Sequence, residues 1–201
     1  MTNQRNFKWN TLYNEKPVEE MGWYYPELDP DLETALSTRN ITTGTFLDLG
    51  TGPGRQAIEL AKKGFSVTGT DISSNAIEGA TQLSGKVHFK QDDILNSTLN
   101  TQFDYIFDRG CYHVFGESNR PAYVRAVKQL LKDNGLLFLK CFSDREPDIG
   151  KGPYRSSENT INKTFGKEFN IETITHTVYQ GTRETFPKAL FAIMRKNYTL
   201  R

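Results

Sequence analysis

The stretch "FLDLGTGPGRQA", Phe46–Ala57, decides how the rest of the sequence is interpreted. A short apolar run containing one acid leads into three glycines at alternate positions, Gly50, Gly52 and Gly54. A helix-like segment, Arg55–Lys63, follows directly. A glycine-rich turn between a strand and a helix is typical of a ligand site, because backbone without Cβ atoms and a helix N-terminus face the ligand. The surrounding sequence must then say which ligand it is.

Composition predicts one folded domain without a strongly charged surface. The chain has 201 residues, 36% of them hydrophobic and 24% charged, which is enough to build a core. Twenty-five basic and 24 acidic residues give a net charge of +1. Such a balance offers no strong attraction to nucleic acid or to an anionic membrane. We therefore expect neither partner, and a monomer or a homodimer.

Targeting and metal signals are also missing from the sequence. The start, "MTNQRNFKWN", lacks the apolar core of a signal peptide, and the longest apolar stretch, Gly135–Phe142, is too short to cross a bilayer. Cys111 and Cys141 form no CxxC pair, and the three histidines show no metal-ligand spacing. The prediction is a cytoplasmic protein with two reduced thiols and no metal.

From Thr45 onward, strand-like and helix-like segments alternate along the chain. Such alternation predicts an α/β fold, a parallel sheet with helices on both faces. The last two strands are close in sequence, so we expect them to form an antiparallel hairpin at one edge. The predicted strands are Thr45–Leu49, Ser66–Thr70, Lys86–Lys90, Phe103–Phe107, Gly135–Phe142, Phe169–Tyr179 and Lys188–Lys196.

Two of the intervening helices carry clear end signals. Ser73–Leu83 begins with a serine that can cap it. Ser118–Lys132 has an apolar stripe at helical spacing, Ser118 as a possible cap and Pro121 in its first turn. Asn134 and Gly135 are expected to stop this second helix.

The glycine turn does not match the two common phosphate motifs. A dinucleotide turn, G-x-G-x-x-G, would need a third glycine where Arg55 stands, and no G-x-x-x-x-G-K-[ST] run occurs. Asp71 lies twenty-one residues after Gly50, the usual place for a carboxylate that accepts two ribose hydroxyls. That position fits a dinucleotide as well, so Asp71 alone does not discriminate.

The next strand end supplies the discriminating residue. A carboxylate at Asp93 can accept the amino group of adenine, while Ile94 offers a backbone N–H and an apolar wall. Its neighbour Asp92 is expected to be solvated or to cap a helix. The glycine turn, Asp71 and Asp93 together fit one ligand with an amino-acid end, a ribose and an adenine, which is S-adenosylmethionine (SAM).

Two quoted segments carry a family resemblance. "FLDLGTGPGRQAIELAKKGFSVTGTDIS" and "VHFKQDDIL" resemble the first three cofactor motifs of class I SAM-dependent methyltransferases, within a similarity that runs from Thr45 to about Lys196. The resemblance implies a Rossmann-like, doubly wound, three-layer fold. Its seven strands would have the order 3-2-1-4-5-7-6, with the last strand antiparallel. The cofactor-binding residues expected on this basis are Asp48, Gly50, Thr51, Gly52, Gly54, Arg55, Asp71, Ile72, Asp93, Ile94 and Asp108.

A narrower resemblance concerns the two ends of the chain. "WNTLY" and "GKGPYRSSENTINKTFGKEFNIETI" resemble the thiopurine, thiol and halide methyltransferase branch. That likeness implies a tryptophan-bearing N-terminal segment over the cofactor, and a Gly-Pro-aromatic turn before a serine-capped helix. The chain departs from the branch at "MGWYYPELDP", which is not its usual lid.

The first 44 residues are expected to form a lid on a methyltransferase domain that spans residues 45–201. Large aromatic residues stand there among polar neighbours with little strand or helix pattern. A surface helix packed into the core is the alternative. We expect the lid to close when SAM binds, with part of "DRGCYHVF" and of the loop after Pro153 on the opposite wall. The substrate and lid candidates are Trp9, Tyr13, Trp23, Tyr24, Arg109, Tyr112, His113, Tyr154 and Arg155.

The predicted activity is in-line methyl transfer from SAM to a small molecule, with a thiol or another soft nucleophile favoured. A thiol has a pKa of about 8.5 and is partly ionised at neutral pH, so it needs no strong base. A hydroxyl acceptor would need one, and His113 or Asp108 would be the catalytic candidates. The sequence "DRGC" replaces the Asp/Asn-Pro-Pro-aromatic motif of many amino-group methyltransferases. A non-catalytic SAM-binding sensor and an NAD-dependent oxidoreductase remain the alternatives.

Overall fold

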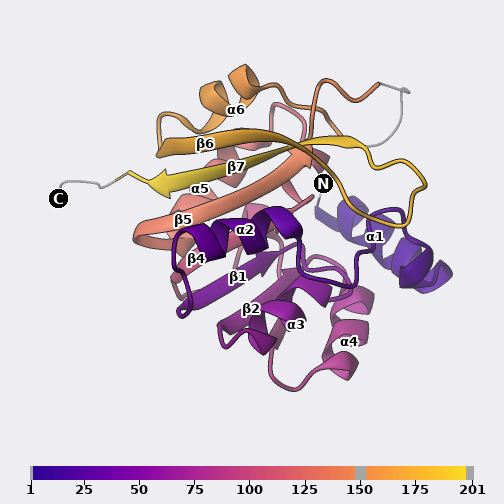
Figure 1. Cartoon of the computed structure of the whole chain (residues 1–201). Coiled ribbons are helices and arrows are strands. Elements are labelled where there is room, and N and C mark those ends of the chain that lie inside the picture. Colours follow the sequence, from indigo (N-terminus) through magenta and orange to yellow (C-terminus); the bar gives the residue numbers. More distant parts are fainter. Residues whose placement is uncertain (1, 148–152, 198–201) are drawn as a thin grey trace. The chain divides into compact units, whose positions relative to one another are not determined.

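The computed structural model describes residues 2–147 and 153–197 (Figure 1). The chain forms two compact units. Unit 1 comprises Met1–Thr98 with Gln180–Glu184, and unit 2 comprises Leu99–Tyr179 with Thr185–Arg201.

One seven-stranded sheet has the strand order β3-β2-β1-β4-β5-β7-β6, with helices on both sides. The β1–β2, β2–β3 and β4–β5 pairs are parallel, whereas β7 is antiparallel to both β5 and β6. The predicted fold class, the strand order and the antiparallel hairpin are therefore confirmed. The hairpin places β6 at the edge and β7 between β5 and β6.

Unit 1 packs its helices around three short parallel strands. The β1 strand is buried almost throughout, and Phe46 packs edge-on against Phe65 at 5.0 Å between ring centroids. The elements are α1 (Thr2–Glu15), η1 (Val18–Glu20), α2 (Pro30–Thr38), β1 (Thr45–Leu49), α3 (Arg55–Lys62), β2 (Ser66–Asp71), α4 (Ser74–Leu83), β3 (His88–Gln91) and η2 (Ile94–Asn96).

The ends of these helices follow from their sequence. Ser73 caps α4 by accepting a hydrogen bond from the Ala76 N–H, as predicted. Asp29 precedes Pro30, the first residue of α2, and its carboxylate accepts from the Asp31 N–H. The helix α1 occupies the segment whose pattern showed little periodicity, so the structure there is more regular than the sequence indicated.

Unit 2 is built around a cluster of aromatic rings. Tyr112, Tyr123, Phe165 and Phe169 are fully buried and pack against one another at 5.3–6.3 Å between centroids. Ser157 caps the helix after the Pro153 turn, as the branch resemblance implied. The elements are β4 (Phe103–Arg109), η3 (Tyr112–Val114), α5 (Arg120–Leu130), β5 (Leu131–Phe142), α6 (Glu158–Phe165), β6 (Phe169–Val178) and β7 (Lys188–Lys196).

Both predicted ends of α5 were wrong. Asn119 rather than Ser118 holds the N-cap position, and its side chain makes no capping bond. The helix ends at Leu130, and β5 starts at once with Leu131. Asn134, with φ of 61°, lies inside β5, where the pairing with β4 shifts register. The Asn134–Gly135 pair therefore accommodates extra residues in a strand instead of stopping a helix.

The prediction that Asp92 is solvated or caps a helix was also wrong. Asp92 is buried, and one of its carboxylate oxygens accepts hydrogen bonds from both the backbone N–H and the hydroxyl of Thr98, at 2.8 and 3.0 Å. The side chain thus fixes the loop after η2.

A tight backbone contact joins the two parts of unit 1. The Thr182 hydroxyl donates to the Met21 carbonyl at 3.1 Å, so the Gln180–Glu184 loop lies against the segment after η1. A Cβ on Gly181 would overlap the Gly22 carbonyl oxygen. Glycine is therefore needed at position 181 for the close approach of the two loops.

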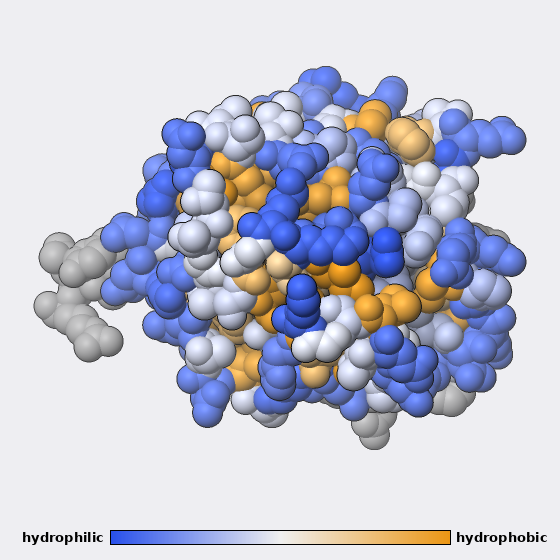
Figure 2. All heavy atoms as spheres, turned by 60° about the horizontal axis from the view of Figure 1, so that its bottom comes forward, coloured by the Kyte–Doolittle hydropathy of each residue, from blue (hydrophilic) through white to orange (hydrophobic). Residues whose placement is uncertain are grey.

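Hydrophilic residues cover most of the face drawn in Figure 2, with hydrophobic residues visible between them. The large hydrophobic residues exposed to solvent include Leu83, Tyr154, Val178 and Phe186. Within the described part of the chain, no helix combines the length and the apolar character needed to cross a membrane.

We predict opposite effects for two glycine-to-alanine changes in unit 1. Gly181→Ala should lower the free energy of unfolding by about 1–3 kcal/mol, because the new methyl overlaps backbone that cannot rotate away. Gly79→Ala, in the exposed interior of α4 with open space around it, should raise it by about 0.5–1 kcal/mol. Urea denaturation followed by circular dichroism measures both. A Gly181→Ala protein as stable as wild type would refute the contact.

Candidate active site

The glycine turn after β1 is held by two hydrogen bonds of Thr51. Gly50, Gly52 and Gly54 have φ of 70°, 50° and 76°, all in the left-handed region that favours glycine. The Thr51 N–H donates to the Thr70 carbonyl at 2.8 Å, and the Thr51 hydroxyl donates to the buried Asp48 carboxylate at 2.5 Å. Asp48 therefore orders the turn from β1.

Asp71 stands at the end of β2 beside this turn. Its carboxylate accepts from the Gly52 N–H at 3.0 Å and from the Ser73 N–H at 2.9 Å. Burial raises the pKa of Asp71 to about 6, although these backbone hydrogen bonds and one from Ile72 oppose the shift. The side chain keeps some solvent exposure, so a ligand that brings further donors would stabilise its ionised form.

The predicted adenine residues follow β3. Asp93 begins η2, where its carboxylate accepts from the Leu95 N–H at 3.2 Å and from the Asn96 side-chain amide at 3.0 Å. Ile94 is buried, while Asp93 is only half-buried. Ile72 is half-buried and lies between Asp71 and the Ser73 cap. The structure thus places Asp71 and Ile72 at the end of β2, and Asp93 and Ile94 directly after β3.

Asn10 hydrogen-bonds helix α1 to the start of α4. The sequence analysis did not predict this contact. The Asn10 side-chain oxygen accepts from the Ser73 hydroxyl at 2.7 Å, and its backbone carbonyl accepts from the Asn75 amide at 3.0 Å. Ser73 uses the same hydroxyl oxygen to cap α4. Ser73 therefore caps α4 and also holds α1 in place. No local pattern in the sequence predicts the contact between Ser73 and Asn10, because they are far apart in the chain.

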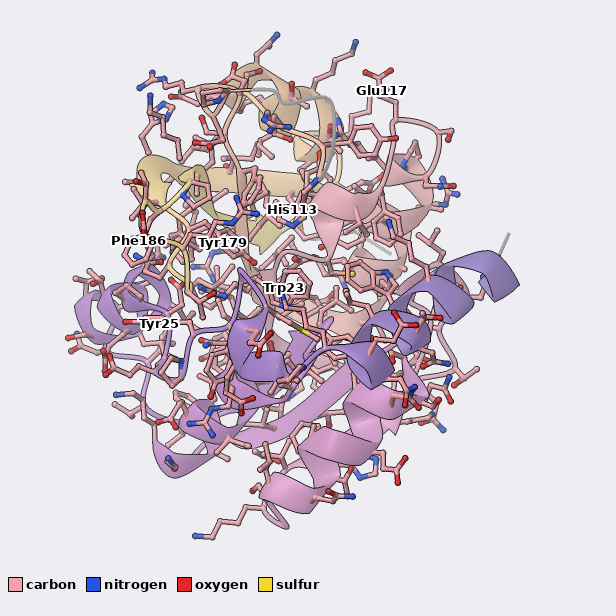
Figure 3. All side chains as sticks on the ribbon, turned by 90° about the vertical axis from the view of Figure 1, so that its right-hand side faces the viewer. Trp23, Tyr25, His113, Glu117, Tyr179 and Phe186 are labelled. Atoms are coloured by element: carbon pink, nitrogen blue, oxygen red, sulfur yellow. The ribbon has the colours of Figure 1, made fainter. Side chains whose placement is uncertain are left out.

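Three of the predicted lid aromatics gather on this helix and on the segment after it. Trp9 packs against Tyr13 at 6.5 Å and edge-on against Trp23 at 6.0 Å between centroids; Figure 3 labels Trp23. A Cβ on Gly52 would lie 2.5 Å from the Tyr13 hydroxyl. The side chain of Tyr13 thus reaches the glycine turn directly, whereas Tyr24 is half-buried and donates its N–H to the Met21 carbonyl.

Arg55, the first residue of α3, turns toward the chain before α2. Its guanidinium donates to the Pro26 carbonyl at 3.2 Å. Neighbouring Gln56 accepts from the Asp29 N–H at 2.8 Å and donates to the Glu27 carbonyl at 2.8 Å. These bonds hold the Pro26–Asp29 segment against the helix that follows the glycine turn.

In unit 2, the Asp108 carboxylate organises the turn after β4. It is fully buried and accepts from the N–H groups of Gly110, Cys111 and Tyr112 at 2.8–3.0 Å, and from the Tyr123 hydroxyl at 2.5 Å. Burial raises its pKa to about 6, and the four hydrogen bonds oppose that rise. The oxygens of Asp108 are therefore engaged with the protein itself.

His113 lies in η3, between two aromatic rings of unit 2. Its ring packs against Phe142 and Tyr179 at 4.9 and 5.8 Å between centroids, and Figure 3 labels His113 and Tyr179. The Phe142 N–H donates to Nδ1 at 3.3 Å. Burial, and then the neighbouring Arg109 charge, lower the pKa of His113 to about 3. A general base there would need a free lone pair on Nε2, and this tautomer places the proton on that atom.

Arg109 and Tyr179 pair closely within unit 2. The guanidinium carbon of Arg109 lies 4.5 Å above the Tyr179 ring, and the Tyr179 hydroxyl donates to the Arg109 carbonyl at 2.6 Å. Tyr179 comes directly after the last residue of β6, so the hairpin brings it to the end of β4. Sequence analysis placed Tyr179 in a strand and gave it no role in the site.

The remaining candidates of unit 2 are Tyr112, Tyr154 and Arg155. Tyr112 is fully buried in the aromatic core, with the Arg120 guanidinium 5.1 Å from its ring. Tyr154 is 54% exposed, and its N–H donates to the His113 carbonyl at 2.7 Å. Arg155 donates to the carbonyls of Glu146, Pro147 and Pro153. Tyr112 and Arg155 thus make mainly internal contacts, while Tyr154 offers an exposed ring.

No cluster of three His, Cys, Asp or Glu side chains suited to a metal ion occurs among residues 2–147 and 153–197. The polar groups that the structure gathers in unit 1 instead suit an organic ligand. The glycine turn presents backbone without side chains, and Asp71 can accept hydrogen bonds from hydroxyl groups. The Tyr13 hydroxyl lies beside Gly52.

Comparisons with known proteins indicate a methyltransferase. The Methyltransferase domain family matches residues 46–135. An uncharacterised methyltransferase of Schizosaccharomyces pombe is 34% identical over 105 residues, which is 49% of this chain and 71% of the yeast protein. Thiopurine S-methyltransferase of Legionella pneumophila (strain Paris) is 26% identical over 190 residues, 85% of each protein.

Solved structures share the fold over almost the whole chain. A structure described for the conversion of a disulfide bond into a thioacetal group during echinomycin biosynthesis superposes with a TM-score of 0.83 at 23% identity, covering 96% of this chain and 92% of that one. Magnesium protoporphyrin IX methyltransferase from Synechocystis PCC 6803, with bound S-adenosylhomocysteine (SAH), gives 0.73 at 18% identity, covering 96% and 98%. By its sequence motifs, its strand order and its yeast relative, the chain belongs to the class I SAM-dependent methyltransferases.

Proposed function

We propose that this SAM-dependent methyltransferase methylates a thiol, or a similarly soft nucleophile, of a small molecule. The observation that carries the proposal is the engagement of both candidate bases. Asp108 already accepts four hydrogen bonds, and His113 carries its proton on Nε2. A hydroxyl acceptor would lack a base at these residues, whereas a thiol ionises without one. The likeness to a thiopurine S-methyltransferase supports the same acceptor class.

We assign the cofactor to unit 1, residue by residue. The ribose hydroxyls would donate to Asp71, and the adenine amino group to Asp93, with Ile94 as the apolar neighbour of the base. The backbone at Gly50 and Gly52 would lie along the amino-acid end of the ligand. The partial exposure of Asp71 and the positive φ of both glycines support this assignment.

Bound SAM supplies the electrophilic methyl group, so the residues of the chain bind, orient and exclude water. In unit 1, the Asp48–Thr51 pair keeps the turn rigid, and Asp71 fixes the Gly52 N–H. The proposed lid, residues 1–44, contributes Tyr13 over Gly52 and is held by Asn10 on α4. A closed α1 would therefore keep water from the glycine turn.

We further propose a reducing, cytoplasmic setting for the protein. Both cysteines, Cys111 and Cys141, are free thiols. Burial raises the pKa of Cys141 to about 12, which makes it unreactive.

The first prediction concerns Asp71 and pH. Since the ionised carboxylate accepts the ribose hydroxyls and its pKa is about 6, the affinity for SAH should fall as the pH drops below about 6, approaching tenfold per pH unit. Asp71→Asn should bind SAH about 10- to 100-fold more weakly at pH 8 and with little pH dependence. Isothermal titration between pH 5 and 8 measures both proteins.

The unliganded protein provides the control for Asp71→Asn. The folded-state pKa lies above the ordinary value of 3.8, so the stabilisation from protonated Asp71 is full below about pH 3.8 and is lost as the pH rises through about 6. Asp71→Asn should consequently be at least as stable as wild type at pH 8. An unchanged pH dependence of SAH binding in the variant would assign it to another group, such as Asp108, and overturn the ribose assignment.

The second prediction concerns the hydrogen bond between Asn10 and Ser73, which holds the proposed lid on α4. Asn10→Ala removes the acceptor of the Ser73 hydroxyl, so amide hydrogen exchange in α1 should become about 5- to 30-fold faster, the effect of losing a cap of about 1–2 kcal/mol. SAH should slow exchange of α1 in the wild type. Asn14→Ala, an exposed residue of the same helix, is the matched control and should change little. Exchange in α1 that ignores both SAH and Asn10→Ala would show that α1 is not a ligand-linked lid.

The third prediction tests the acceptor class. With SAM present, formation of SAH should be fastest with aryl and alkyl thiols, and at least tenfold slower with matched phenols, alcohols and amines. Mass spectrometry of the methylated product identifies the atom that received the methyl group. Faster turnover of an amine or a hydroxyl compound than of every thiol would refute the thiol assignment while leaving the methyltransferase activity intact.

A further inference from the structure

Arg120, the first residue of α5, carries a positive charge on a side chain that is almost fully buried in unit 2. The residue is 7% exposed, and its Nε donates to the Phe115 carbonyl at 3.2 Å. Among residues 2–147 and 153–197, no carboxylate forms an ion pair with Arg120. Arginine is rarely buried to this extent without an anionic partner, so this guanidinium calls for an explanation.

The side chains that face the guanidinium are neutral. Its central carbon lies 5.1 Å from the centroid of the Tyr112 ring and 5.9 Å from that of Tyr154. Burial raises the pKa of Tyr112 and raises that of Cys141 to about 12, and the Arg120 charge acts on both in the opposite direction. Neither group is ionised near neutral pH, so neither balances the positive charge. Glu117, the acid closest to Arg120 in the chain and labelled in Figure 3, is exposed to solvent.

The end of the Arg120 side chain remains open to solvent. In the described part of the chain, the buried side-chain nitrogens and oxygens without a hydrogen-bond partner are Arg55 Nε, the Tyr112 hydroxyl and Ser156 Oγ. The terminal nitrogens of Arg120 are not among these atoms, although no described residue accepts a hydrogen bond from them. They are therefore exposed. Most of the side chain is fixed by its surroundings, while its terminal N–H groups can bind a ligand from solvent.

Tyr154 supplies an apolar surface beside this guanidinium. The residue is 54% exposed, and its backbone N–H donates to the His113 carbonyl at 2.7 Å. A Cβ on Gly116 would lie 3.1 Å from the Tyr154 hydroxyl, so glycine at this position gives the ring room. A partly exposed aromatic ring next to a guanidinium suits a ligand that combines a carboxylate with an apolar body.

We propose that Arg120 and Tyr154 form a binding site in unit 2 for a small carboxylate with an aromatic or other apolar body. The terminal N–H groups of Arg120 donate to the two carboxylate oxygens, a pairing that the planar guanidinium favours. The body of the ligand packs on the exposed Tyr154 ring. Every residue of the site belongs to unit 2, and the site does not depend on which acceptor the enzyme methylates.

Binding of 4-fluorophenylacetate to the full chain, followed by ¹⁹F nuclear magnetic resonance, tests this site. The amide 4-fluorophenylacetamide has the same ring without the charge. The wild type should bind the acid about 10- to 100-fold more tightly than the amide, because only the acid offers an ionised acceptor to the guanidinium. Added salt should reduce this preference by screening the two charges.

Four substitutions separate the charge from the ring. Arg120→Gln should abolish the preference for the acid, whereas Arg120→Lys, which keeps the charge without the planar guanidinium, should retain part of it. Tyr154→Leu should weaken binding of the acid and the amide alike, by about 2- to 10-fold. Arg125→Gln is the matched control: it removes the same charge from an exposed residue of α5 and should leave both affinities unchanged.

The Arg120 Nε–H resonance in ¹H–¹⁵N spectra, assigned from the side-chain carbons, gives a readout in the unsubstituted protein. It should shift when the acid is added and stay in place with the amide. Should Arg120→Gln fail to fold, an unshifted resonance at saturating acid overturns the site. The proposal is also wrong if the acid shows no saturable binding, if the amide binds equally well, if folded Arg120→Gln keeps the wild-type preference, or if Arg125→Gln loses it.

Discussion

The hydrogen bond from the Thr51 hydroxyl to the buried Asp48 carboxylate is the constraint on which the cofactor side of the molecule depends. Gly50, Gly52 and Gly54 all have positive φ. Such a turn keeps its shape only when hydrogen bonds fix the residues between the glycines. Thr51 is tied twice, by its hydroxyl to β1 and by its N–H to β2. The start of α3 and the position of the Gly52 N–H follow from this one residue.

Two carboxylates share a raised pKa but face different surroundings. Asp71 and Asp108 both have a pKa of about 6, because burial outweighs their hydrogen bonds. Asp108 gathers three backbone N–H groups and the Tyr123 hydroxyl, so its charge stabilises the turn after β4. Asp71 accepts from Gly52 and Ser73 and keeps some exposure, so a ligand can add donors to it. The contrast supports the proposal that Asp71 binds the ligand, whereas Asp108 holds the turn after β4.

The sequence predicted what depends on local pattern. Periodicity predicted the strands, and helix-cap chemistry predicted the Ser73 cap, whereas the strand order came from the family resemblance. What it missed depends on distant partners. Helix α1 carries little periodicity, and its place is set by Asn10 on Ser73, 63 positions away. Asn134 and Gly135 were expected to end a helix, yet the pairing of β5 with β4 places them inside a strand. Adjacent Asp92 and Asp93 differ in burial, and Thr98, six positions away, folds back onto Asp92.

His113 illustrates how packing alone can fix the protonation state of a titratable side chain. The Phe142 N–H donates to Nδ1 at 3.3 Å, so the hydrogen of the neutral ring is on Nε2. Burial, and then the Arg109 charge, lower the pKa of His113 to about 3, because both disfavour the imidazolium form. Arg109 is itself held by Tyr179, whose ring faces the guanidinium and whose hydroxyl donates to the Arg109 carbonyl. The packing of η3 against Phe142, Arg109 and Tyr179 therefore keeps this histidine neutral.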